Sequence, residues 1–341
     1  AAGIIMNGFF PEIGTIWWAV FFGLVVTILN LFRVDKFGES EFWLSLIKVT
    51  ALVAFSVAAL LICLGLIGDG GYIGTRILLG SGGFAPHGYW SIAFTMVIIL
   101  VNFQGTEIIG LAAGETADPA RSIPTAVRNI TWRIIALYII PITLLISILP
   151  WDHATLSESV FAAALAEHGF SELAALFSFV VLTAAISCSN SGLYGAARTV
   201  HALAAMGMAP RILEGLSSKG VPSRAIYASI VFCWGVIGLY AMNPNAALYT
   251  YLLALSGFSG AVAWISICWS QYRRRRKLEE AGMDGLLRYR MPLFPYVPLF
   301  GIWAQVLCLA FMIFTPELRS ALYLGVPMLV VPMIVYYLRQ R

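Results

Sequence analysis

The sequence predicts an all-α protein that crosses a membrane many times. Of its 341 residues, 60% are hydrophobic and only 11% are charged, whereas soluble domains carry about 25% charged residues. The mean hydropathy is +0.85, and the apolar residues form runs of about 20, the length that an α-helix needs to span a bilayer. These features exclude a soluble domain, and the many aromatic residues exclude a disordered chain.

Nine runs are long enough and poor enough in charge to be membrane spans. Tryptophan residues stand near several of their ends, where membrane proteins concentrate aromatic side chains. The predicted spans are residues 14–32, 43–67, 90–115, 132–150, 173–197, 225–241, 246–270, 295–314 and 320–338.

Basic residues alternate between the loops, and this alternation predicts the topology. Of the 21 lysine and arginine residues, only Arg76 and Arg319 lie on one side of the predicted spans, and Lys48 lies within a span. The loops that hold the others are residues 33–42, 116–133, 198–224 and 271–294, together with the C-terminus. Because loops rich in Lys and Arg stay in the cytoplasm, we expect the C-terminus inside the cell and Ala1 outside.

Two of the basic loops have features of their own. Ala209-Pro210 and Gly220-Val221-Pro222 interrupt loop 198–224, which predicts short helices and turns there. The run Arg273–Lys277 follows a span directly. Such a run is typical of a stop-transfer segment or a lipid-facing basic cluster rather than of a nucleic-acid site.

The stretch Asn102–Pro119 interrupts an apolar run with polar residues and glycines. Gln104, Gly105, Thr106 and Glu107 stand where a membrane helix should still be apolar. A carboxylate at that depth costs about 2.5–3.5 kcal/mol on insertion scales, so it normally faces a cavity or a partner. One interpretation is a discontinuous helix whose unwound middle binds a ligand. The alternative is a kinked helix whose Glu107 bonds to a neighbouring helix.

Two further charged residues lie in or near spans. Lys48 is surrounded by apolar residues; because burial disfavours the charged amine, it could exchange a proton, or it could extend its ammonium to the membrane interface. Glu115 lies eight residues after Glu107, about two helical turns further on. It could line the same pathway, or it could cap the span end beside Arg121.

One face of the span at 173–197 is polar, because Ser187, Asn190, Ser191 and Tyr194 recur at helical spacing. In lipid this face must meet protein or water, although small polar residues also join ordinary membrane helices. The five cysteines lie in apolar runs without metal-ligand spacing, and the four histidines are scattered. We therefore expect no metal site and no cofactor, and the absence of a nucleophile–base pair argues against an enzyme.

Five motifs stand in one order along the chain: Gly38-Glu-Ser-Glu-Phe-Trp-Leu-Ser-Leu-Ile-Lys48, the stretch Phe103–Pro119, Ser122-Ile-Pro-Thr-Ala-Val127, Asn190-Ser-Gly-Leu-Tyr194 and Gly220-Val-Pro222. Together they resemble the amino acid permeases of the amino acid–polyamine–organocation superfamily, in particular the bacterial amino acid transporter family with its lysine and S-methylmethionine carriers. The resemblance covers essentially the whole chain.

The resemblance implies a fold of twelve spans, in which a five-plus-five inverted repeat is followed by two helices. The nine spans would match spans 4–12, so we expect a single partial permease domain (1–341) that begins partway through a longer protein. Within it, residues 1–68 would end the first repeat, residues 90–270 would form the second, and residues 295–338 would be the two extra helices.

The resemblance also implies roles for single residues. Phe103, Gln104, Gly105, Thr106 and Glu107 would meet the amino group of the substrate. Lys48 would couple transport to protons in place of a sodium ion, and Glu115 would be a further acidic residue on the inner pathway. Ser187, Asn190 and Ser191 would line the scaffold helix opposite, where Ser187 or Ser191 would hold the charged Lys48.

The function predicted from this resemblance is secondary active transport of an amino acid across the cytoplasmic (inner) membrane of a bacterium, by proton symport. The alternatives are an ion or solute channel and an amino acid exchanger without net proton coupling. The expected partners are an amino acid, protons and the lipid bilayer, and no nucleic acid. The side chain that the substrate carries cannot be read from the sequence.

Overall fold

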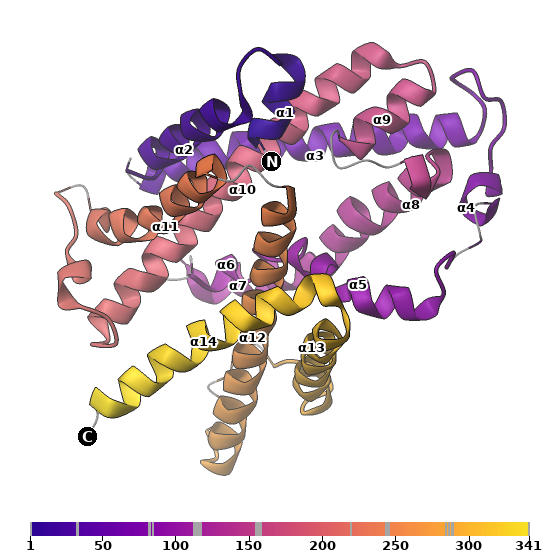
Figure 1. Ribbon diagram of the computed structural model, residues 1–341. Helices are drawn as coiled ribbons and strands as arrows, with labels where there is room; N and C mark the ends of the chain where they lie inside the picture. Colours follow the sequence, from indigo (N-terminus) through magenta and orange to yellow (C-terminus); the bar gives the residue numbers. More distant parts are fainter. Residues whose placement is uncertain are drawn as a thin grey trace. The chain divides into compact units, whose positions relative to one another are not determined.

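Helices are the only regular secondary structure in the part of the chain that the computed structural model describes (Figure 1). The described residues are 2–31, 34–80, 83, 85–111, 118–153, 159–218, 220–242, 246–283, 285, 287 and 290–339. The helices are α1 (Ala2–Phe9), α2 (Thr15–Leu31), α3 (Val34–Cys63), α4 (Arg76–Gly80), α5 (Tyr89–Val101), α6 (Ile108–Leu111), α7 (Pro119–Ile134), the π-helix η2 (Ile135–Ile139), α8 (Ile140–Ile148), η3 (Trp151–His153), α9 (Val160–Glu167), α10 (Ser171–Ala205), η4 (Arg211–Glu214), α11 (Ser223–Met242), α12 (Ala246–Glu280), α13 (Tyr296–Phe314) and α14 (Pro316–Arg339).

Seven helical stretches in the described residues are long and apolar enough to cross a membrane: Glu41–Cys63, Arg121–Ile148, Ser171–Ala205, Ser223–Met242, Tyr251–Glu280, Tyr296–Phe314 and Ala321–Leu338. Helix α2 is apolar but has only 17 residues. The span expected at 90–115 is interrupted after Val101. These helices confirm the prediction of an all-α polytopic membrane protein.

Four segments that the sequence suggested were loops are partly helical, so those predicted boundaries are wrong. Helix α3 begins at Val34, inside the expected loop 33–42. Helix α7 begins at Pro119, inside the expected loop 116–133. The backbone N–H of Arg121 donates to the Asp118 carboxylate at 3.3 Å, so Asp118 caps the helix and Pro119 occupies its first position. Helices α10 and α12 continue to Ala205 and Glu280, because the polar residues after each apolar run are good helix formers.

Glycines end both of these long helices. Gly207 has φ of 74° and Gly282 has φ of 66°, a left-handed conformation that glycine adopts without a steric penalty. After α10, Met208 N donates to Leu203 O at 2.8 Å, and after α12, Met283 N donates to Leu278 O at 2.8 Å. These bonds belong to the Schellman motif, which satisfies the last carbonyls of a helix. The glycines, rather than the loss of apolar character, therefore set the helix ends.

The described residues form two compact units, of which the first contains residues 1–86 and 126–243. Its central helix is α10, which contacts α2, α3, α9 and α11. Phe55 of α3 is 1% exposed; its ring centroid lies 4.9 Å from that of Phe161 in α9 and 5.5 Å from that of Phe177 in α10. Close packing of this kind holds membrane helices together when no hydrophobic driving force acts between them.

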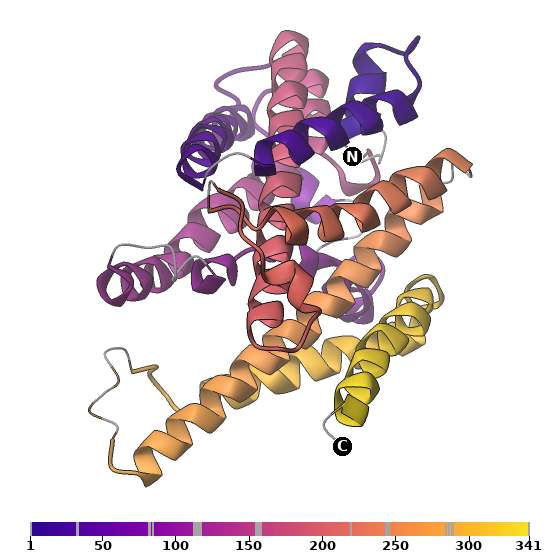
Figure 2. The ribbon, with the colours of Figure 1, turned by 90° about the vertical axis from the view of Figure 1, so that its left-hand side faces the viewer.

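The second unit contains residues 87–125 and 244–341. Its long helix α12 contacts α5, α13 and α14, and Phe258 of α12, Met312 of α13 and Leu318 of α14 share a buried cluster. The basic end of α12, in light orange, projects beyond these contacts (Figure 2). Helix α12 is therefore the central helix of the second unit.

Candidate functional site

A chain of polar side chains joins α3 to α10 in the first unit. The Lys48 Nζ donates to the Ser187 Oγ at 2.7 Å. The Ser187 hydroxyl in turn donates to the Glu41 Oε2 at 2.6 Å. Ser187 is 1% exposed, so the ammonium of Lys48 is directed into the protein and not towards a membrane interface.

Two amides continue this chain to α2. The Asn190 Nδ2 donates to the Glu41 Oε1 at 2.7 Å. The Asn30 Nδ2 donates to the Asn190 Oδ1, also at 2.7 Å. Asn30 is 4% exposed and Asn190 is fully buried. We call these five residues, Lys48, Ser187, Glu41, Asn190 and Asn30, the Lys48 network.

Helical spacing explains why these residues meet. Glu41 and Lys48 lie seven residues apart in α3, two turns on one face, and Ser187 and Asn190 lie three apart in α10. In a membrane every buried polar group must find a partner within the protein, so two polar faces pack against each other. The contact between Lys48 and Ser187 is one of the two that the sequence suggested; Ser191 is half-buried.

Neither Glu41 nor Asn30 was predicted from the sequence as a site residue. The signal for Glu41 was its two-turn spacing from Lys48, and the signal for Asn30 was an amide near the end of an apolar span. Neither pattern identifies a partner, because a spacing within one helix does not say which helix faces it.

In the second unit, the helix after Val101 is broken. Residues 102–107 form turns, and α6 resumes at Ile108. Gly105 has φ of 104°, which other residues adopt only with strain. The interruption therefore coincides with Gln104–Glu107, the four residues that the sequence singled out, and it is a break rather than a kink.

The side chain of Gln104 attaches this break to α12. Its Nε2 donates to the Ser256 carbonyl at 2.7 Å, and its Oε1 accepts from the Ser256 hydroxyl at 2.9 Å. Gly260 makes room for this contact, because a Cβ atom there would overlap the Gln104 amide. The pairing joins residues 152 positions apart and could not be read from either segment alone.

Replacing Gly260 with alanine should push the Gln104 amide away from Ser256. A buried polar group left without its partner costs about 1–3 kcal/mol, so we expect the purified protein to unfold several degrees lower. Gly235→Ala in α11 is the matched control, because a Cβ at Gly235 meets nothing within 4 Å. Equal unfolding midpoints for the two variants would contradict this expectation.

The carboxylate of Glu107 turns back onto the break. Both of its oxygens accept the Gly105 N–H at 3.1 Å, and Oε2 also accepts the Trp264 indole N–H of α12 at 3.2 Å. An ionised carboxylate offers about four acceptor sites. Among the described residues, Oε1 receives only the backbone donor, so it retains capacity for a cationic donor.

The structure thus contains features of both interpretations of Glu107, since the helix is unwound and the carboxylate also bonds a neighbouring helix. Phe103 is half-buried within the break and Thr106 is exposed. Glu115 lies outside the described residues, so its role stays a prediction.

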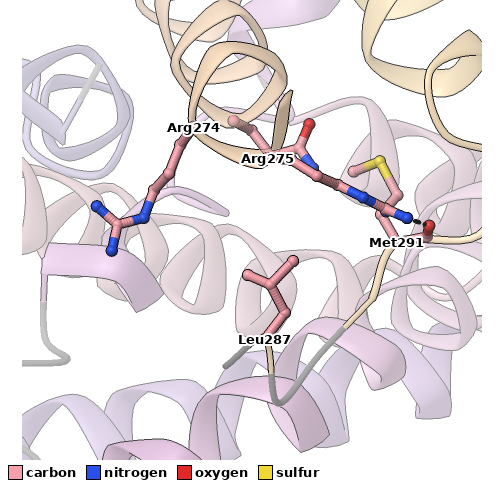
Figure 3. A pocket seen from close by; sticks show the side chains of 5 residues that line it. Arg274, Arg275, Leu287 and Met291 are labelled. Atoms are coloured by element: carbon pink, nitrogen blue, oxygen red, sulfur yellow. Dashed lines mark hydrogen bonds between the residues drawn. The ribbon is translucent and has the colours of Figure 1, made fainter. Parts of the chain in front are cut away.

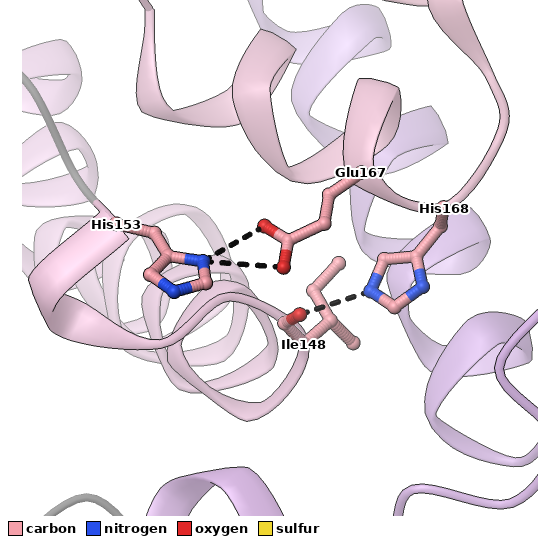
Figure 4. Close-up of polar contacts among 4 residues, drawn as sticks. All are labelled: Ile148, His153, Glu167 and His168. Carbon is pink, nitrogen blue, oxygen red and sulfur yellow. Dashed lines mark hydrogen bonds and ion pairs between the residues drawn. The ribbon is translucent and has the colours of Figure 1, made fainter.

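Two histidines of the first unit have structural partners. The Nε2 atom of the buried His168 lies 2.9 Å from the carbonyl oxygen of Ile148 (Figure 4). The Nδ1 atom of the exposed His153 lies 3.2 Å from the Glu167 Oε1. Within the described residues, no group of three or more His, Cys, Asp or Glu side chains could hold a metal ion. These histidines therefore tie loops to helix ends.

A shallow pocket lies at the basic end of α12. Arg275 donates to the Met291 carbonyl at 2.9 Å and to Glu279 at 3.0 Å. The Arg274 side chain, which also lines the pocket, extends away from Arg275 (Figure 3). The guanidinium of Arg275 also lies 4.2 Å from the centre of the Phe294 ring. Arg275 therefore holds the following segment against the helix. The lipid-facing role expected for the whole basic run stays a prediction.

Comparison with known proteins gives a consistent result. The sequence profile of the family described as amino acid permease matches residues 1–341. The amino-acid permease RocC of Bacillus subtilis is 36% identical over 99% of this chain and 73% of its own length. The lysine-specific permease LysP of Escherichia coli is 39% identical over 91% of this chain and 64% of its own length. A putative histidine permease of Bacillus subtilis is 34% identical over the whole chain and 72% of its own length.

Proposed function

We propose that this protein, which belongs to the amino acid permease family and is therefore an amino acid transporter and not an enzyme, couples the uptake of its substrate to the entry of protons. The membership confirms the resemblance that the motifs suggested. The direction of transport, the coupling ion and the binding residues are the parts that we propose.

The observation that carries the proposal is the hydrogen bond between Lys48 and Ser187. A protonated Lys48 donates to this hydroxyl and holds α3 against α10. A neutral amine is a weaker donor, so loss of the proton loosens the contact between the two helices. The protonation state of Lys48 then shifts the equilibrium between two arrangements of α3 and α10. This shift couples protonation to transport.

The broken helix is the proposed site for the substrate. The backbone at residues 102–107 leaves the helical path, and the Glu107 Oε1 accepts only the Gly105 N–H within the described part of the chain. An α-amino group is a cation with three donors, which matches carbonyl and carboxylate acceptors. Phe103, Gln104 and Thr106 belong to the same break and complete the proposed site.

Uptake by the full-length protein in proteoliposomes tests the coupling. An inward proton gradient should concentrate a radioactive substrate in the vesicles, and a proton ionophore should release it. Accumulation that follows a sodium gradient would contradict proton coupling. Exchange without accumulation would identify an exchanger, and large unitary currents would identify a channel.

A basic amino acid is the first candidate substrate. The relative named as a lysine-specific permease is 39% identical, and Glu107 supplies negative charge within the proposed site. Competition between labelled lysine and each of the twenty amino acids tests this choice. The strongest competitor identifies the preferred side chain, and failure of lysine and arginine to compete would contradict it.

The alternation of basic loops supports a cytoplasmic position for loop 198–224 and for the C-terminus. A cysteine introduced at the exposed Ser218 should therefore resist a membrane-impermeant maleimide in intact cells and react after the cells are opened. Thr75, exposed in a loop expected outside, is the matched control and should react in intact cells as Thr75→Cys. Labelling of Ser218→Cys from outside would reverse the proposed topology.

A further inference from the structure

We propose that Glu41 is the group with which Lys48 exchanges its proton, through the hydroxyl of Ser187. This inference rests on the proposed proton coupling and adds a second titratable residue to it. Glu41 is the first residue of the apolar stretch Glu41–Cys63 and is half-buried. Its carboxylate accepts hydrogen bonds from Ser187 and Asn190 of α10, which identifies its partners.

The geometry of the three groups is that of a short proton relay. The Lys48 Nζ lies 2.7 Å from the Ser187 Oγ, which lies 2.6 Å from the Glu41 Oε2. The hydroxyl accepts a hydrogen bond from the ammonium and donates one to the carboxylate, so both hydrogen bonds run in the same direction, from Lys48 to Glu41. A hydroxyl can serve as donor and acceptor at once, and Ser187 is the link between the two charged groups.

The transfer moves one proton from Lys48 to Glu41, and the number of protons in the relay stays the same. The ammonium of Lys48 gives one proton to the Ser187 oxygen while that oxygen passes its own hydroxyl proton to the Glu41 Oε2. The products are a neutral amine, an intact hydroxyl and a neutral carboxylic acid, and the hydrogen bonds then run in the opposite direction.

The amides of the Lys48 network hold Glu41 in position for this step. The Asn190 Nδ2 donates to the Glu41 Oε1 at 2.7 Å, which leaves Oε2 directed at Ser187. Asn30 in turn fixes the Asn190 Oδ1. These two side chains do not titrate, so they can orient the carboxylate without competing for its proton.

Lys48 is the charged group that reaches Glu41 through the relay. Of the elements that contact α3, α10 presents the neutral Ser187 and Asn190 to the carboxylate. Helix α8 contains no titratable side chain, and η2 contains only Tyr138. The pH dependence expected of the relay is therefore that of Lys48 and Glu41 together.

Removal of either end of the relay should uncouple transport. In proteoliposomes, Glu41→Gln should lower proton-driven accumulation, measured relative to substrate counterflow by the same sample, at least tenfold. It should also flatten the dependence of uptake on pH, which a packing defect would not do. Glu41→Asp, which keeps the titratable group, should recover part of both. Glu172→Gln, at an exposed carboxylate in the first turn of α10, is the matched control and should match the wild type.

A second pair of variants keeps the test decisive if Glu41→Gln fails to fold. Ser187→Ala removes the hydroxyl without changing any charge, and Ser187→Thr retains it. We expect Ser187→Ala to lose coupling and Ser187→Thr to retain it. Loss in both, or retention in both, would overturn the relay.

The result separates failure of the relay from failure of the proposed function. If wild-type uptake does not respond to a proton gradient, the proposed function is wrong. If Lys48→Ala loses accumulation while Glu41→Gln keeps the wild-type ratio and pH profile, proton coupling stands and the relay alone is wrong.

Discussion

Replacing Lys48 with alanine is expected to reduce proton-driven accumulation of substrate to the level of protein-free vesicles. The substitution removes the donor that binds the Ser187 Oγ at 2.7 Å and with it the contact whose strength depends on protonation. Lys48→Arg should fail in the same assay, because a guanidinium keeps its proton throughout the physiological range. The measurement is uptake by the full-length protein under an imposed inward proton gradient.

Lys277→Ala is the matched control for this experiment. Lys277 is exposed near the end of α12, so the same substitution there should leave accumulation unchanged. If Lys48→Ala concentrates substrate as far as the wild type does, Lys48 is not the coupling residue. An arginine variant that still accumulates substrate would show that the positive charge matters and its titration does not.

The second large effect is expected at Glu107, where the substitution Glu107→Gln should weaken substrate binding about tenfold. A hydrogen bond to a charged group contributes about 1.5–3 kcal/mol, and about 1.4 kcal/mol is a factor of ten in Kd. Glutamine keeps the size of the side chain and an acceptor oxygen for the Gly105 and Trp264 donors. It loses the charge that would attract an ammonium group.

Binding of labelled substrate to the detergent-purified variant gives Kd, and its unfolding midpoint gives stability. We expect Kd to rise while the midpoint stays close to the wild-type value. Trp264→Phe is the companion variant, because it removes the indole donor to Glu107 and keeps an aromatic ring. An unchanged Kd together with a lowered midpoint in Glu107→Gln would support the purely structural interpretation, in which Glu107 only ties the break to α12.

Much of this architecture follows from local patterns. Long apolar runs with few charges predict membrane helices, because a bilayer admits only segments whose backbone groups bond internally. Polar residues and Gly105 within such a run predicted the break, and the break is present after Val101. The ends of α10 and α12 could also have been found, since Gly207 and Gly282 are stronger signals for a helix end than the loss of apolar residues.

Local sequence patterns are therefore sufficient to predict the class of the protein, its family and the segments that carry polar groups. They do not predict which of those groups meet, because that depends on how the helices pack. Glu41 reaches Ser187 across 146 positions and Gln104 reaches Ser256 across 152. Helical periodicity places a side chain on a face, but it does not identify the helix packed against that face. The identity of that helix depends on close packing between helices far apart in the chain. In this protein the packing of α3 against α10 brings Glu41 and Lys48 to Ser187.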